Sequence, residues 1–227
     1  MSITPLDGPG TSTRRRLLQA ALKAFGHRDY DAVSTREIVE AAGTNISAIS
    51  YHFGGKRGLY LATAEYLAES MRAGLQIPLD RIHARLPGAD VKQCRQMLSD
   101  FIRGFAEELL TGEYAEDAPG FIFREQNHPT DAFDILFEKL LKPVQDMLAR
   151  LVGRIRGLAP DTRETRLTAH ALMGLAISFR AGRTTVLKHL ARPAYTPVDI
   201  ERIGALVAAM SAAALDYTLI EIPGDRL

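Results

Sequence analysis

Residues 34–61 read STREIVEAAGTNISAISYHFGGKRGLYL, and this stretch decides the fold. Ser34 followed three residues later by Glu37 is the pattern of a capping box, which predicts the start of a helix. Gly43 lies where a helix end needs a left-handed residue, and Asn45 is a candidate N-cap for a second helix. Two short helices joined by a glycine-containing turn form a helix-turn-helix.

The second helix of this motif has two different faces. Ile49 and Phe53 repeat at helical spacing and are expected to be mostly core. The other side carries the small residues Ser47, Ala48 and Ser50. Small polar and methyl-bearing side chains suit a helix that enters a major groove about 12 Å wide. The sequence therefore predicts that this helix reads DNA.

The stretch resembles the DNA-binding domain of the tetracycline-repressor (TetR) family of bacterial transcription regulators. The matching residues, in order, are Val33, Ser34-Thr35-Arg36, Ala42-Gly43, Tyr51-His52-Phe53 and Lys56. Many members carry an aromatic residue where this chain has Ser50, so the base preference there stays open. The resemblance implies a three-helix head over residues 12–60, with Tyr30 and Val33 in its core, and a longer helix linking it to a body.

Docking geometry assigns roles to side chains of the head, and the resemblance implies the same positions. We expect Arg36 to fork onto a guanine, the small residues of the second helix to face bases, and flanking groups to hold phosphates. Some of these residues have plain structural alternatives: His52 can brace a helix end, and Ile46 can be partly core. The expected DNA-binding set is Thr35, Arg36, Asn45, Ile46, Ser47, Ala48, Ser50, Tyr51, His52 and Lys56.

Composition and charge are compatible with a small basic head on a larger body. The 227 residues are 46% hydrophobic and 24% charged, which are globular averages. Residues 1–60 hold eight Lys or Arg and five Asp or Glu, a net +3; the whole chain is +1, so the remainder is −2. A basic module on a slightly acidic body fits a DNA-binding head, although an ordinary solvated surface explains the charge equally well.

Other classes of protein find little support. Cys94 is the only cysteine, so no intrachain disulfide or cysteine zinc site is expected. No apolar run reaches the ~18–20 residues of a membrane span, and the first residues do not resemble a signal peptide. There is no G-x-S-x-G, P-loop or H-E-x-x-H motif. We expect a cytoplasmic, non-enzymatic protein that needs no metal or cofactor and does not bind a membrane.

The remainder of the chain is expected to be an all-α body over residues 61–227, giving about nine helices in the whole protein. We expect the first helix to begin after Ser12 or Thr13, which places three arginines in its first turn. Residues 76–90, which include Pro78, are expected to form a broken connection or a short helix between loops, and one helix is expected over residues 160–190. REQNHPTDAFD (residues 124–134), Pro143 and FRAGRTTVLKHL (residues 179–190) resemble the CecR/CerR-type branch of the family.

Two functions are expected of the body. Aromatic, Met and charged residues can line a pocket for an apolar or amphiphilic effector, although an aromatic stripe is more often core. The candidate effector residues are Phe101, Phe105, Phe121, Arg124, Glu125, Phe133, Met173 and Arg180. The last two long helices can pair with a second copy as a four-helix bundle or contribute to intrachain core. The candidate dimerisation residues are Leu172, Leu175, Phe179, Leu206, Met210 and Ala213.

The sequence therefore predicts a homodimeric repressor that binds a palindromic double-stranded DNA operator and is released by a small molecule. One head covers only part of a useful site, which is the reason to expect a dimer. The alternative is a helical scaffold that binds partner proteins and has a weak, nonspecific DNA-binding head. Specific binding in the presence of competitor DNA separates the two.

Overall fold

The computed structural model describes residues 9–216, with side chains from residue 12 onward. Over this range it contains eleven α-helices, one 3₁₀ turn and one π-helical turn, and no strand. The all-α prediction is confirmed, although the expected number of about nine helices was low. The chain forms two compact units: unit 1 runs to Gly74 and includes Glu113–Pro143, and unit 2 comprises Leu75–Gly112 and the chain from Val144.

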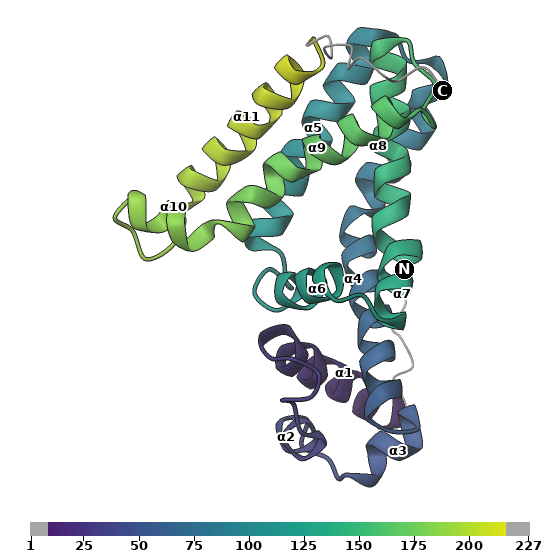
Figure 1. Ribbon diagram of the computed structural model, residues 1–227, viewed down its shortest axis with the longest axis vertical. Coiled ribbons are helices and arrows are strands. Elements are labelled where there is room, and N and C mark those ends of the chain that lie inside the picture. Colours follow the sequence, from purple (N-terminus) through teal and green to yellow (C-terminus); the bar gives the residue numbers. More distant parts are fainter. Residues whose placement is uncertain (1–8, 217–227) are drawn as a thin grey trace, which may run out of the picture. The chain divides into compact units, whose positions relative to one another are not determined.

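Unit 1 begins with a small helical head. Helices α1 (Pro9–His27), α2 (Thr35–Ala41) and α3 (Ser47–Phe53) pack around one another beside the start of α4 (Lys56–Arg85) (Figure 1). The apolar stripe of α1 meets buried residues of the two shorter helices, so the head has its own core. The buried residues include Leu17, Leu18, Leu22, Phe25, Val33, Ile38, Val39 and Ile49.

The start of α1 differs from the expectation. The helix begins at Pro9, so neither Ser12 nor Thr13 caps it. Proline is well suited to the first helical position, because its missing N–H would have no helical acceptor there. Arg14 and its two neighbours consequently lie in the second turn, where the helix dipole opposes cations less strongly than in the first.

A second set of helices completes unit 1. Helices α6 (Ala118–Asn127) and α7 (Asp131–Leu136) are followed by the π-helical turn Phe137–Leu141. Helix α6 packs against α1, and the backbones approach closely: a Cβ built on Gly120 would collide with the carbonyl oxygen of Gly26. Only glycine permits this contact.

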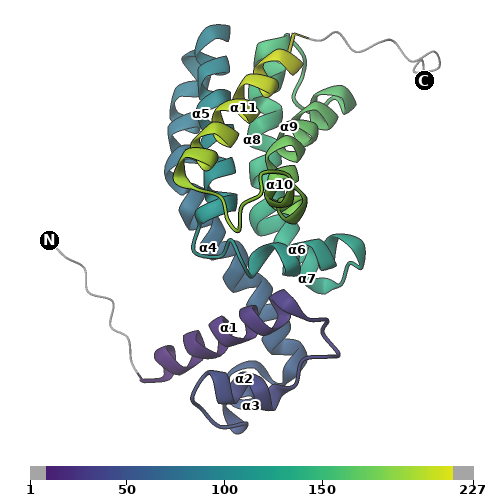
Figure 2. The same cartoon turned by 90° about the vertical axis from the view of Figure 1, so that its left-hand side faces the viewer.

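Unit 2 is a bundle of longer helices. Helix α5 (Val91–Thr111) packs against α9 (Arg163–Ala181) and α11 (Pro197–Ala214), with most of α8 (Lys142–Arg156) in the same unit (Figure 2). Capping boxes start α5 at Asp90 and α11 at Thr196. The apolar faces of these helices form the core of the unit.

Two expectations about helix ends were wrong. Helix α4 continues through most of the expected connection, to Arg85, with Pro78 inside it. Pro78 cannot donate to the carbonyl of Gly74, the residue at which unit 1 ends. The expected helix over residues 160–190 is two helices, α9 and α10 (Arg183–His189), separated at Gly182. The last helix, which the sequence predicts to run from Thr196-Pro197 to about residue 220, is α11 and ends at Ala214; residues beyond 216 lie outside the described range.

Candidate DNA-binding site

The helix-turn-helix forms as its local signals predict. Ser34 accepts a hydrogen bond from the Glu37 N–H at 3.2 Å, and Glu37 Oε2 accepts one from the Ser34 N–H at 3.3 Å. Glu37 also pairs with Arg28 at 2.8 Å. The hydrogen bond from Arg28 and the backbone of Ser34 lower the pKa of Glu37. Because Arg28 is held in this pair, it fixes the start of α2 rather than standing free beside it.

The turn and the second helix also match the predicted motif. Gly43 has φ +59° and Gly54 has φ +72°, so glycines in the left-handed region follow α2 and end α3. Asn45 Oδ1 accepts a hydrogen bond from the Ala48 N–H at 3.1 Å. Asn45 therefore acts as the predicted cap, although the regular helix is assigned from Ser47.

Helix α3 presents one face to the core and another to solvent. Ile49 is buried, whereas Ser47 and Ser50 are exposed and Ala48 is half-buried. Tyr51 and Ile46 expose 84% and 51% of their surface, so both side chains are accessible to a partner. Phe53, expected to be core, is half-buried, with Arg14 5.4 Å from its ring centroid.

The remaining expected DNA-binding residues lie close to α3 in sequence and belong to the same head. Arg36 is exposed and Thr35 is half-buried in the first turn of α2. His52 is half-buried near the end of α3, with its ring 4.9 Å from that of Tyr51. The Lys56 ammonium lies 4.3 Å from the ring centroid of Tyr30. Lys56 therefore has a structural cation–π contact that the sequence did not reveal.

The candidate effector residues are divided between the two units. Phe121, Arg124, Glu125 and Phe133 belong to unit 1, while Phe101, Phe105, Met173 and Arg180 belong to unit 2. Phe101, Phe105 and Met173 are buried, in line with the alternative that such a stripe is core. Phe133 is half-buried and stacks on Phe137 with 6.1 Å between ring centroids.

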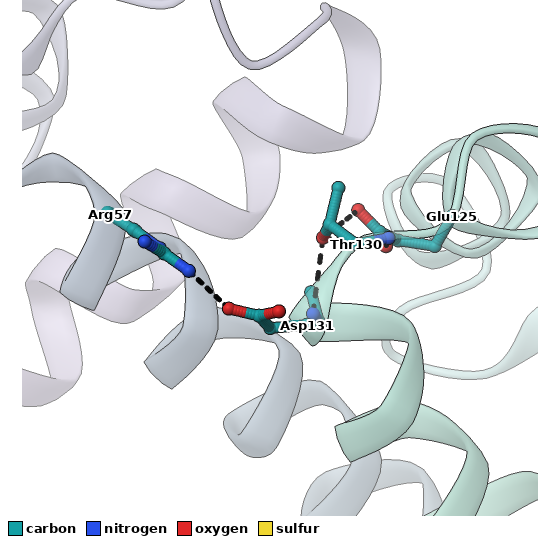
Figure 3. A network of polar contacts seen from close by, with 5 residues as sticks. Arg57, Glu125, Thr130 and Asp131 are labelled. Atoms are coloured by element: carbon teal, nitrogen blue, oxygen red, sulfur yellow. Dashed lines mark hydrogen bonds and ion pairs between the residues drawn. The ribbon is translucent and has the colours of Figure 1, made fainter.

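Two charged members of this set hold unit 1 together. Arg124 donates a hydrogen bond to the carbonyl oxygen of Phe25. Glu125 is only 2% exposed and accepts a hydrogen bond from the Tyr60 hydroxyl at 2.5 Å. It also accepts one from the Thr130 N–H at 3.0 Å, and Figure 3 shows Thr130 beside the Glu125 carboxylate. A buried carboxylate needs such donors, so both side chains have structural partners that account for their positions.

A second layer of contacts supports the same connection. His27 Nε2 lies 2.9 Å from the Asp117 carboxylate, and Arg57 at the start of α4 pairs with Asp131 at the start of α7 (Figure 3). Lys139 pairs with two glutamates of α4. Unit 1 therefore joins the head and the α6–α7 segment through several polar contacts as well as through buried apolar residues.

The candidate dimerisation residues have mixed exposure. Leu206 and Met210 expose 49% and 46% of their surface, and Ala213 is also exposed, so α11 presents an apolar face. Leu175 and Phe179 of α9 are half-buried. Leu172 is 1% exposed and belongs to the core of unit 2.

Residues 9–216 offer neither a metal site nor a membrane-spanning helix. No group of His, Cys, Asp and Glu side chains among these residues is arranged to hold a metal ion. Within the same range, no helix combines the length and apolar character that a membrane span requires.

Comparisons with known proteins agree with this architecture. Residues 17–63 match the family model of bacterial regulatory proteins of the tetR family, and residues 94–216 match the C-terminal domain of the HTH-type transcriptional dual regulator CecR. The chain is 35% identical over 199 residues to CecR of Shigella flexneri, covering 85% of each protein. It is 37% identical over 71 residues to the repressor AcnR of Corynebacterium glutamicum, covering 31% of this chain and 37% of AcnR.

Solved structures share the fold at lower identity. A TetR-family regulator from Mesorhizobium loti superposes with a TM-score of 0.61 at 20% identity, covering 91% of this chain and 98% of that one. AibR, solved in complex with isovaleryl coenzyme A and operator DNA, gives a TM-score of 0.62 at 15% identity, covering 87% of this chain and 97% of AibR.

Proposed function

Because the chain belongs to the tetR family of bacterial regulatory proteins and has a CecR-type C-terminal domain, we propose that it is a repressor that binds a two-fold symmetric operator as a homodimer. The family makes it a DNA-binding transcription regulator and not an enzyme. The observation that carries the finer proposal is the solvent-exposed face of α3, which presents two serines and Tyr51, together with the exposed Arg36 on the preceding helix α2. We place this activity in the cytoplasm, where the DNA is.

The proposed dimer uses the apolar face of α11. Leu206, Met210 and Ala213 lie four and three residues apart, which places them on one side of the helix. Burying two large side chains that are about half exposed in the single chain contributes favourably at roughly 25 cal/mol per Å² of apolar surface. Dimerisation also supplies the second head that a two-fold operator requires.

Replacing both large residues with glutamate tests this interface. The double variant Leu206→Glu/Met210→Glu should sediment as a monomer and lose tight operator binding, because two charges cannot be buried without partners. Val198→Glu is the matched control, since Val198 is 54% exposed in the first turn of the same helix, eight residues before the Leu206–Ala213 segment. A double variant that remains dimeric would exclude α11 as the interface.

The proposed effector is an apolar or amphiphilic small molecule. AibR was solved with both isovaleryl coenzyme A and operator DNA, which shows that this fold can hold both kinds of ligand. In this chain the candidate effector residues remain those of the sequence prediction, and α6 is the segment of that set that contacts the head. A ligand that prefers the conformation unable to bind DNA would release the operator in proportion to its preference.

Arg124 is the residue through which we propose to test this response. Its bond to the Phe25 carbonyl oxygen joins α6 to α1. A screen for compounds that release the operator should find a ligand, and Arg124→Ala should then release DNA less completely even at ligand concentrations that saturate it. Equal release by Arg124→Ala and by the unchanged protein would remove this residue from the response.

Selection of DNA fragments tests the operator itself. The purified full-length protein should enrich a small set of genomic fragments whose common sequence has two-fold symmetry, with half-sites about 10 base pairs apart or a multiple of this. Enrichment without a common sequence would favour the scaffold alternative, in which the head binds DNA only through phosphate contacts.

A second candidate function is dual regulation, in which the protein represses some genes and activates others. It is favoured by one observation, that the relative from Shigella flexneri is described as a dual regulator. A reporter placed behind each enriched fragment distinguishes the two. Repression at every fragment supports the main proposal, and activation at some of them supports dual regulation.

A further inference from the structure

Asn45, which lies just before α3, accepts two hydrogen bonds, and these determine whether the exposed Ser47 side chain can donate or only accept. The Ala48 N–H lies 3.1 Å from Asn45 Oδ1. A backbone N–H can only donate, so the Asn45 atom that faces it must be the amide oxygen and not the amide nitrogen. The bond from the Ala48 N–H therefore determines the orientation of the Asn45 carboxamide.

The Ser47 hydroxyl is bound to the same oxygen. Ser47 Oγ lies 2.6 Å from Asn45 Oδ1. An amide oxygen carries no hydrogen, so the Ser47 hydroxyl must be the donor. Ser47 is exposed on the face of α3 proposed to read DNA. Its only hydroxyl hydrogen is already used, and it can offer the DNA only its oxygen lone pairs.

A serine that can only accept is selective where a free serine is not. A free hydroxyl rotates and pairs with either donors or acceptors on base edges. In the major groove the donors are the amino groups of adenine N6 and cytosine N4, while guanine O6 and N7, adenine N7 and thymine O4 accept.

We propose that Ser47 accepts a hydrogen bond from the exocyclic amino group of an adenine or a cytosine in each half-site, and that Asn45 is the positioning residue that enforces this polarity. This rests on the proposed function, since it requires that α3 enter the major groove of a specific operator. The inference adds to the proposed function the class of base that Ser47 selects, namely a base with an exocyclic amino group.

Single-atom changes in the selected operator provide the test. Purine in place of one adenine removes its N6 amino group, and 2-pyrimidinone in place of one cytosine removes its N4 amino group; 7-deaza purines remove the N7 acceptor. Each substituted duplex is measured with the full-length protein and with Ser47→Ala. Deletion of one particular amino group should weaken DNA binding by the unchanged protein about tenfold and have little effect on binding by Ser47→Ala. A 7-deaza substitution, by contrast, should change the binding of both proteins by the same factor.

Variants of Asn45 test the positioning role. Asn45→Asp keeps an oxygen that accepts from both Ala48 and Ser47, so it should keep the coupling of Ser47 to the amino group even if the added negative charge weakens binding to every sequence. Asn45→Ala frees the Ser47 hydroxyl, so the coupling should fall and a new sensitivity to N7 deletion should appear. A purely structural cap would lower stability without changing which base atom matters.

Ser50→Ala is the matched control, since Ser50 is a second exposed serine of α3. It should leave the coupling between the amino group and Ser47 unchanged. Coupling of Ser47 to an acceptor atom, or to no base atom at all, would overturn the inference while leaving the proposed operator binding intact. A protein that selects no operator would instead overturn the proposed function, and the inference with it.

Discussion

Tyr60→Phe removes one hydroxyl from the contact between α4 and α6. In the native chain this hydroxyl donates to Glu125 Oε1 at 2.5 Å, and both side chains are buried. The ring of Tyr60 packs against Phe25 and Phe121, each with 4.9 Å between ring centroids. Phenylalanine keeps those ring contacts, so the substitution isolates the hydrogen bond.

The expected cost follows from the kind of bond that is lost. A hydrogen bond to a charged group contributes about 1.5–3 kcal/mol, and leaving a buried acceptor short of a donor carries its own penalty. We expect the free energy of unfolding to fall by about 1.5–3 kcal/mol, with a decrease in Tm of about 3–10 °C. Glu125 retains the backbone and side-chain donors of Thr130, which keeps the loss within this range.

Urea denaturation followed by circular dichroism measures this loss, with Tyr66→Phe as the control. Tyr66 shares a hydrogen bond of 2.9 Å with the hydroxyl of Tyr114, a neutral and only partly buried pair. Its loss should cost about 0.5–1.5 kcal/mol. Equal effects of the two variants would refute the reasoning that the Glu125 bond is charge-assisted and desolvated.

The same variant has a predictable pH dependence. Burial, followed by the hydrogen bond to Glu125, raises the pKa of Tyr60. A raised pKa in the folded state means that the stabilising contribution is complete below the unfolded value of about 10 and is lost as the pH rises above it. The difference in stability between the native protein and Tyr60→Phe should therefore decrease above about pH 10. A constant difference across that range would contradict the raised pKa of Tyr60.

Gly120→Ala should lower the free energy of unfolding by about 1–3 kcal/mol, because its Cβ would collide with the carbonyl oxygen of Gly26; Gly104→Ala, with open space around its Cβ, should be neutral or stabilising in the same urea titration. Arg36→Ala should cost about 1–3 kcal/mol in operator binding and relax the preference at one base position, which a competition assay over all four bases would detect. Lys56→Ala should instead weaken all DNA sequences alike, and a change confined to one position would contradict a phosphate contact.

The head was predictable because its signals are local. The Ser34–Glu37 capping box, the left-handed Gly43 and the Asn45 cap each depend on residues within four positions of one another. The bond between Asn45 and Ser47 is local too. The capping signal at Asn45 predicts a bond to a backbone N–H of the helix, and it does not indicate that the Ser47 side chain shares the same oxygen.

The connection between the head and α6 was not predictable in the same way. Glu125 and Tyr60 are 65 residues apart, and Arg124 and Phe25 are 99 apart. From sequence alone, charged residues among phenylalanines suggest a ligand site, since their partners become visible only in the folded chain. Gly26 and Gly120 were the available signal, because small residues allow two helices to approach closely.

Errors in helix length have a similar origin. The apolar pattern runs from α9 into α10 without an obvious gap, so the sequence predicts one helix, although Gly182 separates two. Pro78 favours a helix break, yet α4 continues through it to Arg85. Context decides whether a single glycine or proline ends a helix.

The most direct test of the central claim is a titration of the enriched operator duplex with the full-length protein, at several salt concentrations and with excess nonspecific DNA. A sequence-specific regulator should keep its affinity in the presence of competitor and show a steep, linear dependence of log K on log salt. A scrambled duplex of the same length should bind at least about a thousandfold more weakly. Equal affinity for the operator and the scrambled duplex would contradict the claim that the α2–α3 head reads sequence.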